Sequence, residues 1–302
     1  MVRPPSRPQH RTAETLVQST RRAGQASPGR VARGTLGAGR GSAAKSWAAH
    51  LDESCASSSA KSSMVFAKEF FDLQLALAER VRALSGMPLD RALLEYTNLY
   101  VRFGLGRTFD SDHEGWQAYL AGLRDAEDGR DWTYRFYLKD PEATTAPPVV
   151  ATIGCFSYAL SSANHVRLHF RNAETGGRSP LGVARIEQRR ADLLALFTHL
   201  KRTAGDDVTV IGVSWLYNLN AYRRLFPVEY GSSARVVRGG FRSMRLWGQF
   251  LDHRGEAKES MTRQFLTSLA QTSTLDHVDE CFPFKVLTVH APAQRFYDFY
   301  GI

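Results

Sequence analysis

Residues able to bind an anion gather in the segment AETGGRSPLG, residues 173–182. Gly176 and Gly177 permit close approach of the backbone to a ligand, and Ser179 followed by Pro180 is a typical helix start. A glycine-containing loop that leads into a helix presents free N–H groups and the positive end of the helix dipole, which favour a phosphate or pyrophosphate. Basic residues lie in the loop and one and two turns beyond it: Arg178, Arg185 and Arg189. The segment therefore predicts an anion site, although many helix starts of this kind bind only water.

A nucleophile is the second chemistry that the sequence suggests, in IGVSWLYN at 211–218. Ser214 follows Gly212 as in the G-x-S-x-G elbow of serine hydrolases, but Leu216 stands where the sharp turn needs glycine. The acid and the base that act with Ser214 would have to come from residues later in the chain: Asp252 or Asp276 as the acid, and His277 or His290 as the base. The alternative is a small hydroxyl at the end of a strand.

Two patterns resemble metal sites, and both lack an essential part. His165 and His169 alternate with apolar residues, so they belong to a strand and lie ~13 Å apart, too far to share an ion with bonds of ~2 Å. The segment 108–116 opens like a calcium loop with Asp110, Asp112 and Glu114, but Ala121 replaces the bidentate glutamate. We predict no metal site, and a polar sheet face that includes His169.

The elements that position these segments follow from hydrophobic periodicity. Residues 64–130 predict a helical layer, with helices at about 64–85, 90–103 and 114–124. From residue 131 the pattern predicts strands at 132–138, 147–160 and 165–172, a helix at 181–203, a strand at 208–215 and a helix at 218–226. A strand-rich piece at 233–252, a helix at 257–270 and a strand at 284–290 complete the chain. We expect an α/β (α+β) fold with a central mixed sheet and helices on both faces.

This order of elements resembles the core of the GNAT acyltransferase family, in which a strand, a glycine-rich pyrophosphate loop, a helix and a further strand precede an Asn-x-x-Ala helix. Asn218 to Ala221 stands at the place of the Asn-x-x-Ala, Phe226 near the usual aromatic residue, and Tyr230 near the closing one. The resemblance covers residues 132–290, about half of the chain.

The loop departs from the R/Q-x-x-G-x-G/A pattern of that family. Arg178 follows the glycine pair instead of preceding it, and Pro180 lacks an N–H that could donate to phosphate. Glu229 and Tyr230 stand where the family often has Gly-Phe.

The resemblance implies an acyltransferase that uses acetyl-CoA or another acyl-CoA and a small amine or hydroxyl acceptor. It implies that the thioester lies where the strands 165–172 and 208–215 splay, with His169 as general base and Tyr222 or Tyr230 as the acid that protonates the thiolate. The implied cofactor-binding residues are Gly176, Gly177, Arg178, Ser179, Gly182 and Asn218. For each tyrosine, packing in the core is the structural alternative.

Charge and composition restrict the remaining function classes. The chain of 302 residues has a net charge of +9, but residues 1–63 hold 10 of the 39 Lys and Arg and only 3 of the 30 Asp and Glu, which leaves +2 for residues 64–302. The second part therefore lacks the basic excess of a nucleic-acid-binding domain. No apolar run approaches the ~20 residues of a membrane span. Three separated cysteines indicate neither a disulfide framework nor a zinc site, and favour a cytoplasmic, reducing compartment.

Residues 1–63 are rich in Arg, Ser, Gly, Ala and Pro and predict a disordered basic tail ahead of a single globular domain at 64–302. The tail could be an organelle-targeting segment, a contact for an acidic surface, or the result of a start assigned ahead of Met64. Besides the hydrolase, a non-catalytic protein that binds a partner stays open. Its surface would use five arginines: Arg223, Arg224, Arg238, Arg242 and Arg245.

Overall fold

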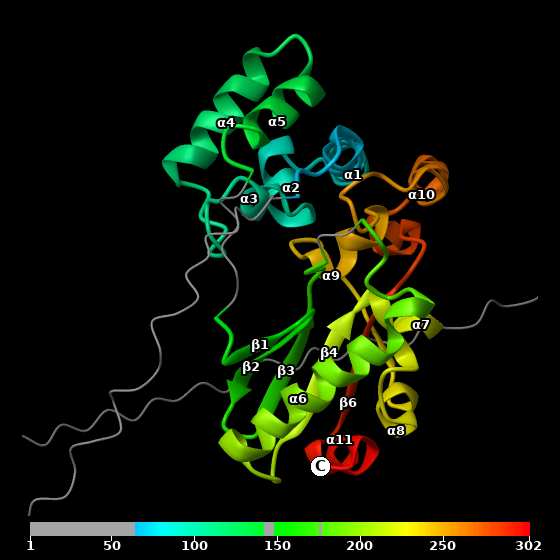
Figure 1. Ribbon diagram of the computed structural model, residues 1–302. Helices are drawn as coiled ribbons and strands as arrows, with labels where there is room; N and C mark the ends of the chain where they lie inside the picture. The colour runs from blue at the N-terminus through cyan, green and yellow to red at the C-terminus, as the bar shows by residue number, and fades with distance from the viewer. Residues whose placement is uncertain (1–63, 142–147, 175–176) are drawn as a thin grey trace, which may run out of the picture. The chain divides into compact units, whose positions relative to one another are not determined.

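The computed structural model describes residues 64–141, 148–174 and 177–302. The predicted tail at 1–63 and Gly176 lie outside the described residues. Helices accompany a six-stranded mixed sheet, so the predicted mixed α/β class is confirmed (Figure 1). Among the described residues no helix is both long and apolar enough to cross a membrane.

The predicted N-terminal helices are present, and one of them is broken. They are α1 (Lys68–Ser85), α2 (Leu89–Tyr96), α3 (Leu99–Arg102) and α4 (Glu114–Asp125). Gly86 ends α1 in the left-handed region with φ of +71°. The expected helix 90–103 breaks at Thr97, whose hydroxyl donates to the Leu93 carbonyl at 2.6 Å, and at Asn98, whose N–H donates to Gln74 Oε1 at 2.8 Å. These side-chain hydrogen bonds compete with the helical ones.

The predicted strand at 132–138 is wrong, because these residues form α5 (Gly129–Tyr137). The Asp128 carboxylate caps this helix by accepting from the N–H groups of Arg130 and Asp131, at 2.8 and 3.1 Å. The buried residues Thr133 and Tyr137 are four apart and share a helical face. The aromatic residues, which favour strands in general, here pack against α1 and α4.

The sheet has the order β1-β2-β3-β4-β6-β5. Its strands are β1 (Ala151–Ile153), β2 (Phe156–Ser162), β3 (His165–Phe170), β4 (Thr209–Ser214), β5 (Arg235–Val237) and β6 (Val286–Pro292). The expected single strand at 147–160 is instead a hairpin of β1 and β2, which turns at Gly154 with φ of +55°. Among the described strands only β3 and β4 pair in parallel, and α6 (Ile186–Ala204) connects them. Strand β6 lies between β4 and β5, antiparallel to both.

After β4 the chain is more helical than the sequence predicts. The segment 218–226 contains the end of a 3₁₀ turn, η2 (Trp215–Asn218), and the short α7 (Asn220–Arg223), with α8 (Val228–Ser232) following. The piece expected to be strand-rich holds only β5 as a strand, together with α9 (Met244–Trp247) and η3 (Gly248–Phe250). Helix α10 (Glu259–Gln271) and strand β6 agree with prediction, and α11 (Ala293–Tyr300) was not predicted.

The described residues form two hydrophobic clusters. One, which we call the sheet core, joins β2, β3, β4 and β6 to α6 and α11, with Leu193, Phe197 and Phe296 each at most 1% exposed. The other, the helical core, joins α1, α2, α4 and α5 to Trp247 and Phe282, and it reaches Val213 of β4 and Val286 of β6. Helices therefore cover part of each face of the sheet.

Candidate functional site

The loop expected to bind pyrophosphate does not lead directly into a helix. Helix α6 begins at Ile186, after a 3₁₀ turn, η1 (Val183–Arg185), that follows Gly182. The Ser179 carbonyl accepts from the Gly182 N–H at 3.1 Å, which closes a turn instead of opening a helix. The Gly177 carbonyl accepts from His253 Nε2 at 2.7 Å and from an Arg254 guanidinium N–H at 3.4 Å. The predicted helix start at Ser179 is therefore wrong.

The arginines after this loop are neutralised by neighbouring carboxylates. Arg189 Nη2 lies 2.7 Å from Glu174 Oε1, and its Nε lies 3.2 Å from Asp192 Oδ2. Arg185 Nη2 lies 2.9 Å from the second Glu174 oxygen. We call these four residues the salt-bridge network. Two cations meet two anions in it, and the Arg189 and Asp192 side chains are 4% and 7% exposed, so no net charge remains for a phosphate.

Cys155 and Gly154 complete this network at the hairpin turn. Arg189 also donates to Cys155 Sγ. Burial raises the pKa of the Cys155 thiol, and the backbone hydrogen bond of Ala173 and the positive charge of Arg189 oppose this only in part. A Cβ added at Gly154 would lie 2.2 Å from Asp192 Oδ2, so the glycine permits the carboxylate to approach the turn. The thiol is therefore a packing group and not a nucleophile.

Both candidate catalytic tyrosines lie in the sheet core. Tyr222 is 2% exposed and Tyr230 is fully buried. The Tyr230 hydroxyl hydrogen-bonds to that of Tyr217 at 2.9 Å, and burial raises the pKa of all three phenols well above 10. Gly212 of β4 leaves room for this pair, since a Cβ there would lie 1.8 Å from the Tyr217 oxygen. The geometry assigns these hydroxyls to packing.

Asn218 and Ser214 hold the turn after β4. The Asn218 amide donates to the carbonyls of Trp215 at 2.7 Å and Lys285 at 2.8 Å, which ties η2 to the chain entering β6. The Ser214 hydroxyl accepts from the Leu216 N–H at 3.1 Å and so caps η2. Asn218 belongs to η2 and not to the helix predicted at 218–226, because α7 begins at Asn220.

The histidine proposed as a partner of Ser214 is not beside it. Ser214 pairs with Leu287 of β6, whereas His290 pairs with Ile211. His290 lies three positions along the strand from Leu287, a distance of ~10 Å. The structure therefore does not bring His290 to Ser214 as a general base.

His169 lies on the sheet face opposite the sheet core, in a group of basic side chains. Strand alternation places Arg167 and His169 on one face, while Val166 and Leu168 are buried on the other. Arg107, after α3, and Arg245, in α9, are close enough for their charges to act on His169. We call Arg107, Arg167, His169 and Arg245 the basic cluster.

The electrostatics of the basic cluster keep His169 neutral at pH 7. Burial lowers its pKa below the usual 6.5, and the charges of Arg167, Arg107 and Arg245 lower it further. The pKa of Arg245 is also lowered, by desolvation and then by Arg167 and Arg107. A neutral imidazole can accept a proton, so His169 meets one requirement of a general base.

The two parallel strands separate next to His169. Their paired residues run from His165 with Thr209 to Leu168 with Gly212, although β3 continues to Phe170 and β4 to Ser214. His169 is thus the first residue of β3 beyond the last pair. Ligands of open α/β sheets bind at the carboxyl ends of the strands, and this point of separation is such a place.

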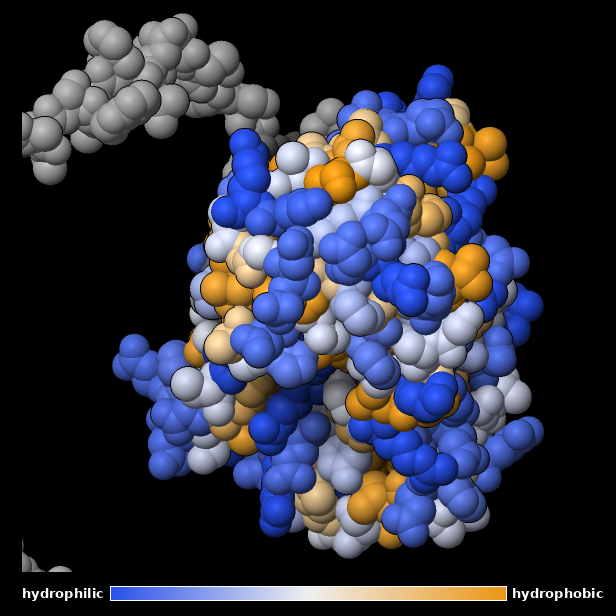
Figure 2. All heavy atoms as spheres, turned by 90° about the horizontal axis from the view of Figure 1, so that it is seen from below, coloured by the Kyte–Doolittle hydropathy of each residue, from blue (hydrophilic) through white to orange (hydrophobic). Residues whose placement is uncertain are grey.

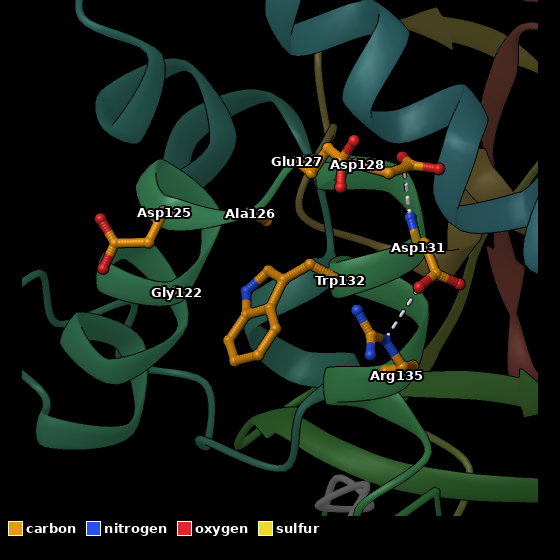
Figure 3. A pocket seen from close by; sticks show the side chains of 8 residues that line it. All are labelled: Gly122, Asp125, Ala126, Glu127, Asp128, Asp131, Trp132 and Arg135. Atoms are coloured by element: carbon orange, nitrogen blue, oxygen red, sulfur yellow. Dashed lines mark hydrogen bonds and ion pairs between the residues drawn. The ribbon is translucent and has the colours of Figure 1, made fainter.

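An open recess between α4 and α5 has the wrong chemistry for a catalytic site. Two of the four carboxylates that line it serve α5: Asp128 caps this helix, and Asp131 pairs with Arg135 at 2.9 Å (Figure 3). The Trp132 ring lies so close to Gly122 that any Cβ there would collide with it. Among the described residues no group of three or more His, Cys, Asp or Glu could hold a metal ion.

The five arginines considered as a partner surface are exposed and have different neighbours. Arg224 donates to the Leu181 carbonyl at 3.1 Å, and Arg242 donates to the Leu94 carbonyl at 3.0 Å and lies over the Phe109 ring. Arg238 faces Asp279 at 4.0 Å, and Arg223 contacts Asn220 within its own helix. Only Arg245 joins the basic cluster. On the face in Figure 2 the hydrophobic side chains form small groups among hydrophilic ones.

Sequence reasoning identified His169 and its alternation with Arg167, but not the residues that come from other elements. Arg107 carries no local pattern, since only the tertiary structure places it near β3. Arg102 of α3 was also missed; it is 8% exposed, and its Nε has no hydrogen-bond partner. The sequence offered one signal for Arg102, namely a basic residue on a helix face that is otherwise apolar.

Comparison with protein-family models, with curated proteins and with solved structures produced no match.

Proposed function

We propose that this protein is an acyltransferase of GNAT-like type, which transfers an acyl group from an acyl-CoA to a small acceptor where β3 and β4 separate. One observation carries the proposal: the parallel pairing of β3 and β4 stops at Leu168 and Gly212, and His169 stands next in the strand. The extended pantetheine arm of CoA would lie along the strand edges beyond that point, because their N–H and C=O groups there lack a strand partner in this pair.

The order of strands supports the same proposal. Strand β3, the loop, α6 and the parallel strand β4 keep the central part of the order that suggested the GNAT family from sequence, although the first strand of that order is the helix α5. The glycine-containing loop lies between β3 and α6, on the side where the two strands end.

The phosphates of CoA require cations, and the exposed cations at the loop include Arg178, Arg224 and Arg254. Arg185 and Arg189 are occupied by Glu174. Arg224 already reaches the loop through its hydrogen bond to Leu181. Two guanidinium groups at this position can form charge-assisted hydrogen bonds to a pyrophosphate.

The chemistry assigned to His169 is proton transfer. Its neutral imidazole accepts the proton of the acceptor amine or hydroxyl as that atom attacks the thioester carbonyl. The C–S bond then breaks, and the imidazolium returns the proton to the CoA thiolate. Tyr222 and Tyr230, which are buried in the sheet core, take no part in this scheme.

Binding is tested first, by thermal unfolding of the full chain with acetyl-CoA, longer acyl-CoAs, ATP and inorganic phosphate. A ligand at 100 times its Kd stabilises by ~2.7 kcal/mol, which for this size raises Tm by roughly 5–10 °C. Arg178→Ala and Arg224→Ala should each reduce the shift, whereas Arg202→Ala, an exposed position near the end of α6, should keep it. No shift with any CoA compound would end the proposal.

Catalysis is tested by release of the free CoA thiol in the presence of a panel of amines and alcohols. His169→Asn should lower kcat by about 100-fold or more while acetyl-CoA still raises Tm, because general-base catalysis contributes ~10²–10⁴-fold. Tyr222→Phe and Tyr230→Phe should leave kcat within about threefold. Equal loss of rate in the tyrosine variants would contradict the assignment of the base.

A further inference from the structure

We infer that the basic cluster binds an oxyanionic small molecule, a phosphate monoester or a carboxylate, and, if the proposed function holds, that this molecule is the acyl acceptor. The inference has two parts that can fail separately. The anion site depends only on the arrangement of Arg167, His169 and Arg245, and its role as acceptor site depends on acyl transfer at the neighbouring strand ends.

Three arginines of this region have no acidic partner among the described residues. No ion pair there includes Arg102, Arg167 or Arg245. Arg167 is half-buried, and its Nε has no hydrogen-bond partner. Unpaired charge that is removed from water costs free energy, so a site that collects such charge gains from binding an anion.

Arg102 extends this positive charge into the protein interior. It is 8% exposed, with an unpaired Nε, and its guanidinium lies 5.6 Å from the centre of the Phe66 ring. Burial lowers its pKa to about 10; Tyr137 opposes this shift, and the charge of Arg107 adds to it. Arg107 acts on Arg102, Arg245 and His169 alike, so these residues share one region of positive potential.

The sheet provides space beside these charges. His169 is opposite Ser157 of β2, and Arg167 is opposite Ala159, so both basic residues have small neighbours on the same face. Thr152 of β1 follows in the same row, opposite Ser157, and is exposed. The helical core covers this face only farther along, at Val213 and Val286. A small ligand can therefore lie on β1 and β2 with its anionic group toward the arginines.

The chemistry of the side chains specifies the ligand class. Guanidinium groups bind carboxylates and phosphates through two parallel N–H donors, and a neutral imidazole can donate one further hydrogen bond. A nucleic acid would need a longer basic surface, which the net charge of +2 for residues 64–302 does not provide. A single molecule with one or two negative charges matches the cluster.

The test is isothermal titration of the full chain with inorganic phosphate, glycerol 3-phosphate and succinate, with neutral glycerol as the control ligand. The anions should bind and glycerol should not, and comparison of phosphate with succinate decides which oxyanion is preferred. Arg167→Gln and Arg245→Gln should each weaken binding by about tenfold or more. Arg202→Gln should leave it unchanged. Equal binding to Arg167→Gln and to the wild type would overturn the inference.

A second measurement keeps the result independent of folding defects. The anion should raise the pKa of His169, followed by NMR of its ring protons, because a negative charge beside the imidazole favours the protonated form. The groups facing it are Arg167 on β3, Ser157 on β2, Arg107 after α3 and Arg245 in α9. An unchanged His169 pKa at saturating anion would place the ligand elsewhere and refute the site.

The acceptor role is tested apart from the anion site. Amines that carry a phosphate or carboxylate should be acylated with kcat/KM at least tenfold above that of uncharged amines of the same length, and Arg245→Gln should remove this preference. Anion binding without any acyl transfer would uphold the site and end the proposed function. Acyl transfer without preference for acidic acceptors would uphold the function and end the acceptor assignment.

Discussion

The salt-bridge network and the basic cluster contain the same residue type in opposite electrostatic settings. In the network, Arg185 and Arg189 meet Glu174 and Asp192 within 3.2 Å. In the basic cluster, Arg167 and Arg245 have no ion pair among the described residues, and the nearby charges that affect His169 are all positive. Paired arginines join the hairpin turn to α6, whereas unpaired arginines leave charge available for a ligand.

This difference decides which arginines belong to a candidate site. Arg189 follows a glycine-containing loop and looks by position like a phosphate ligand, but it is structural. Arg167 lies in the middle of a strand and looks by position like an exposed residue, but it is half-buried and has no ion pair among the described residues. The presence or absence of a counter-ion, and not the distance to the loop, distinguishes the two roles.

The largest expected change in stability follows from removing the central residue of the salt-bridge network. Arg189→Met should lower the free energy of unfolding by about 3–5 kcal/mol, because it leaves Glu174 and Asp192 near one another without a buried cation. Urea denaturation measures this change. The neighbouring control, Arg190→Met, removes an exposed pair with Glu187 and should change stability by less than ~1 kcal/mol. Equal effects would show that the network is not a buried unit.

A smaller effect should follow from Gly154→Ala, which pushes a Cβ against Asp192 without removing any charge. We expect a loss of ~1–3 kcal/mol beyond the cost of a positive φ. Gly86→Ala is the matched control, since its φ of +71° is similar and no other atom lies within 4 Å of its Cβ position. If the two variants lose the same stability in urea, Asp192 does not press against the turn.

Removal of charge from the basic cluster should change the free energy of unfolding in the opposite direction. Arg167→Met should leave the unfolding free energy unchanged or raise it by up to ~1 kcal/mol, because no anionic partner is lost and repulsion by Arg245 is relieved. The same denaturation experiment without added anion measures it. A loss like that of Arg189→Met would indicate a structural partner for Arg167 and would remove the contrast between the two regions.

The smallest effect is a change in how stability depends on pH. The folded protein holds the pKa of His169 below 6.5, so the unfolded chain binds a proton first as the pH falls. The resulting loss of stability is absent above pH 6.5 and grows as the pH falls through the pKa of His169 in the folded protein. Tm of the wild type should therefore fall more steeply than that of His169→Asn below pH 6.5, and parallel curves would refute the lowered pKa.

Much of the fold could be predicted because its signals are local. Helices α1, α4 and α10 have apolar residues at spacings of three and four, and β3 alternates cleanly. The 132–138 segment was misassigned because Trp, Tyr and Phe favour strands in general, while the Asp128 cap and packing against α4 hold it as a helix. Helix α11 was not predicted, although it supplies Phe296 and Tyr297 to the sheet core.

The sequence by itself determined the mixed α/β class, the strand that presents His169 with Arg167, and the loop between β3 and α6, since periodicity and turn residues act over a few neighbours. Only the tertiary structure decided that Glu174 and Asp192 neutralise Arg189, that Tyr222 and Tyr230 are buried, and that Arg107 and Arg245 approach His169. Pairing and burial depend on residues distant in the chain, and charges interact through space, so no local pattern encodes them.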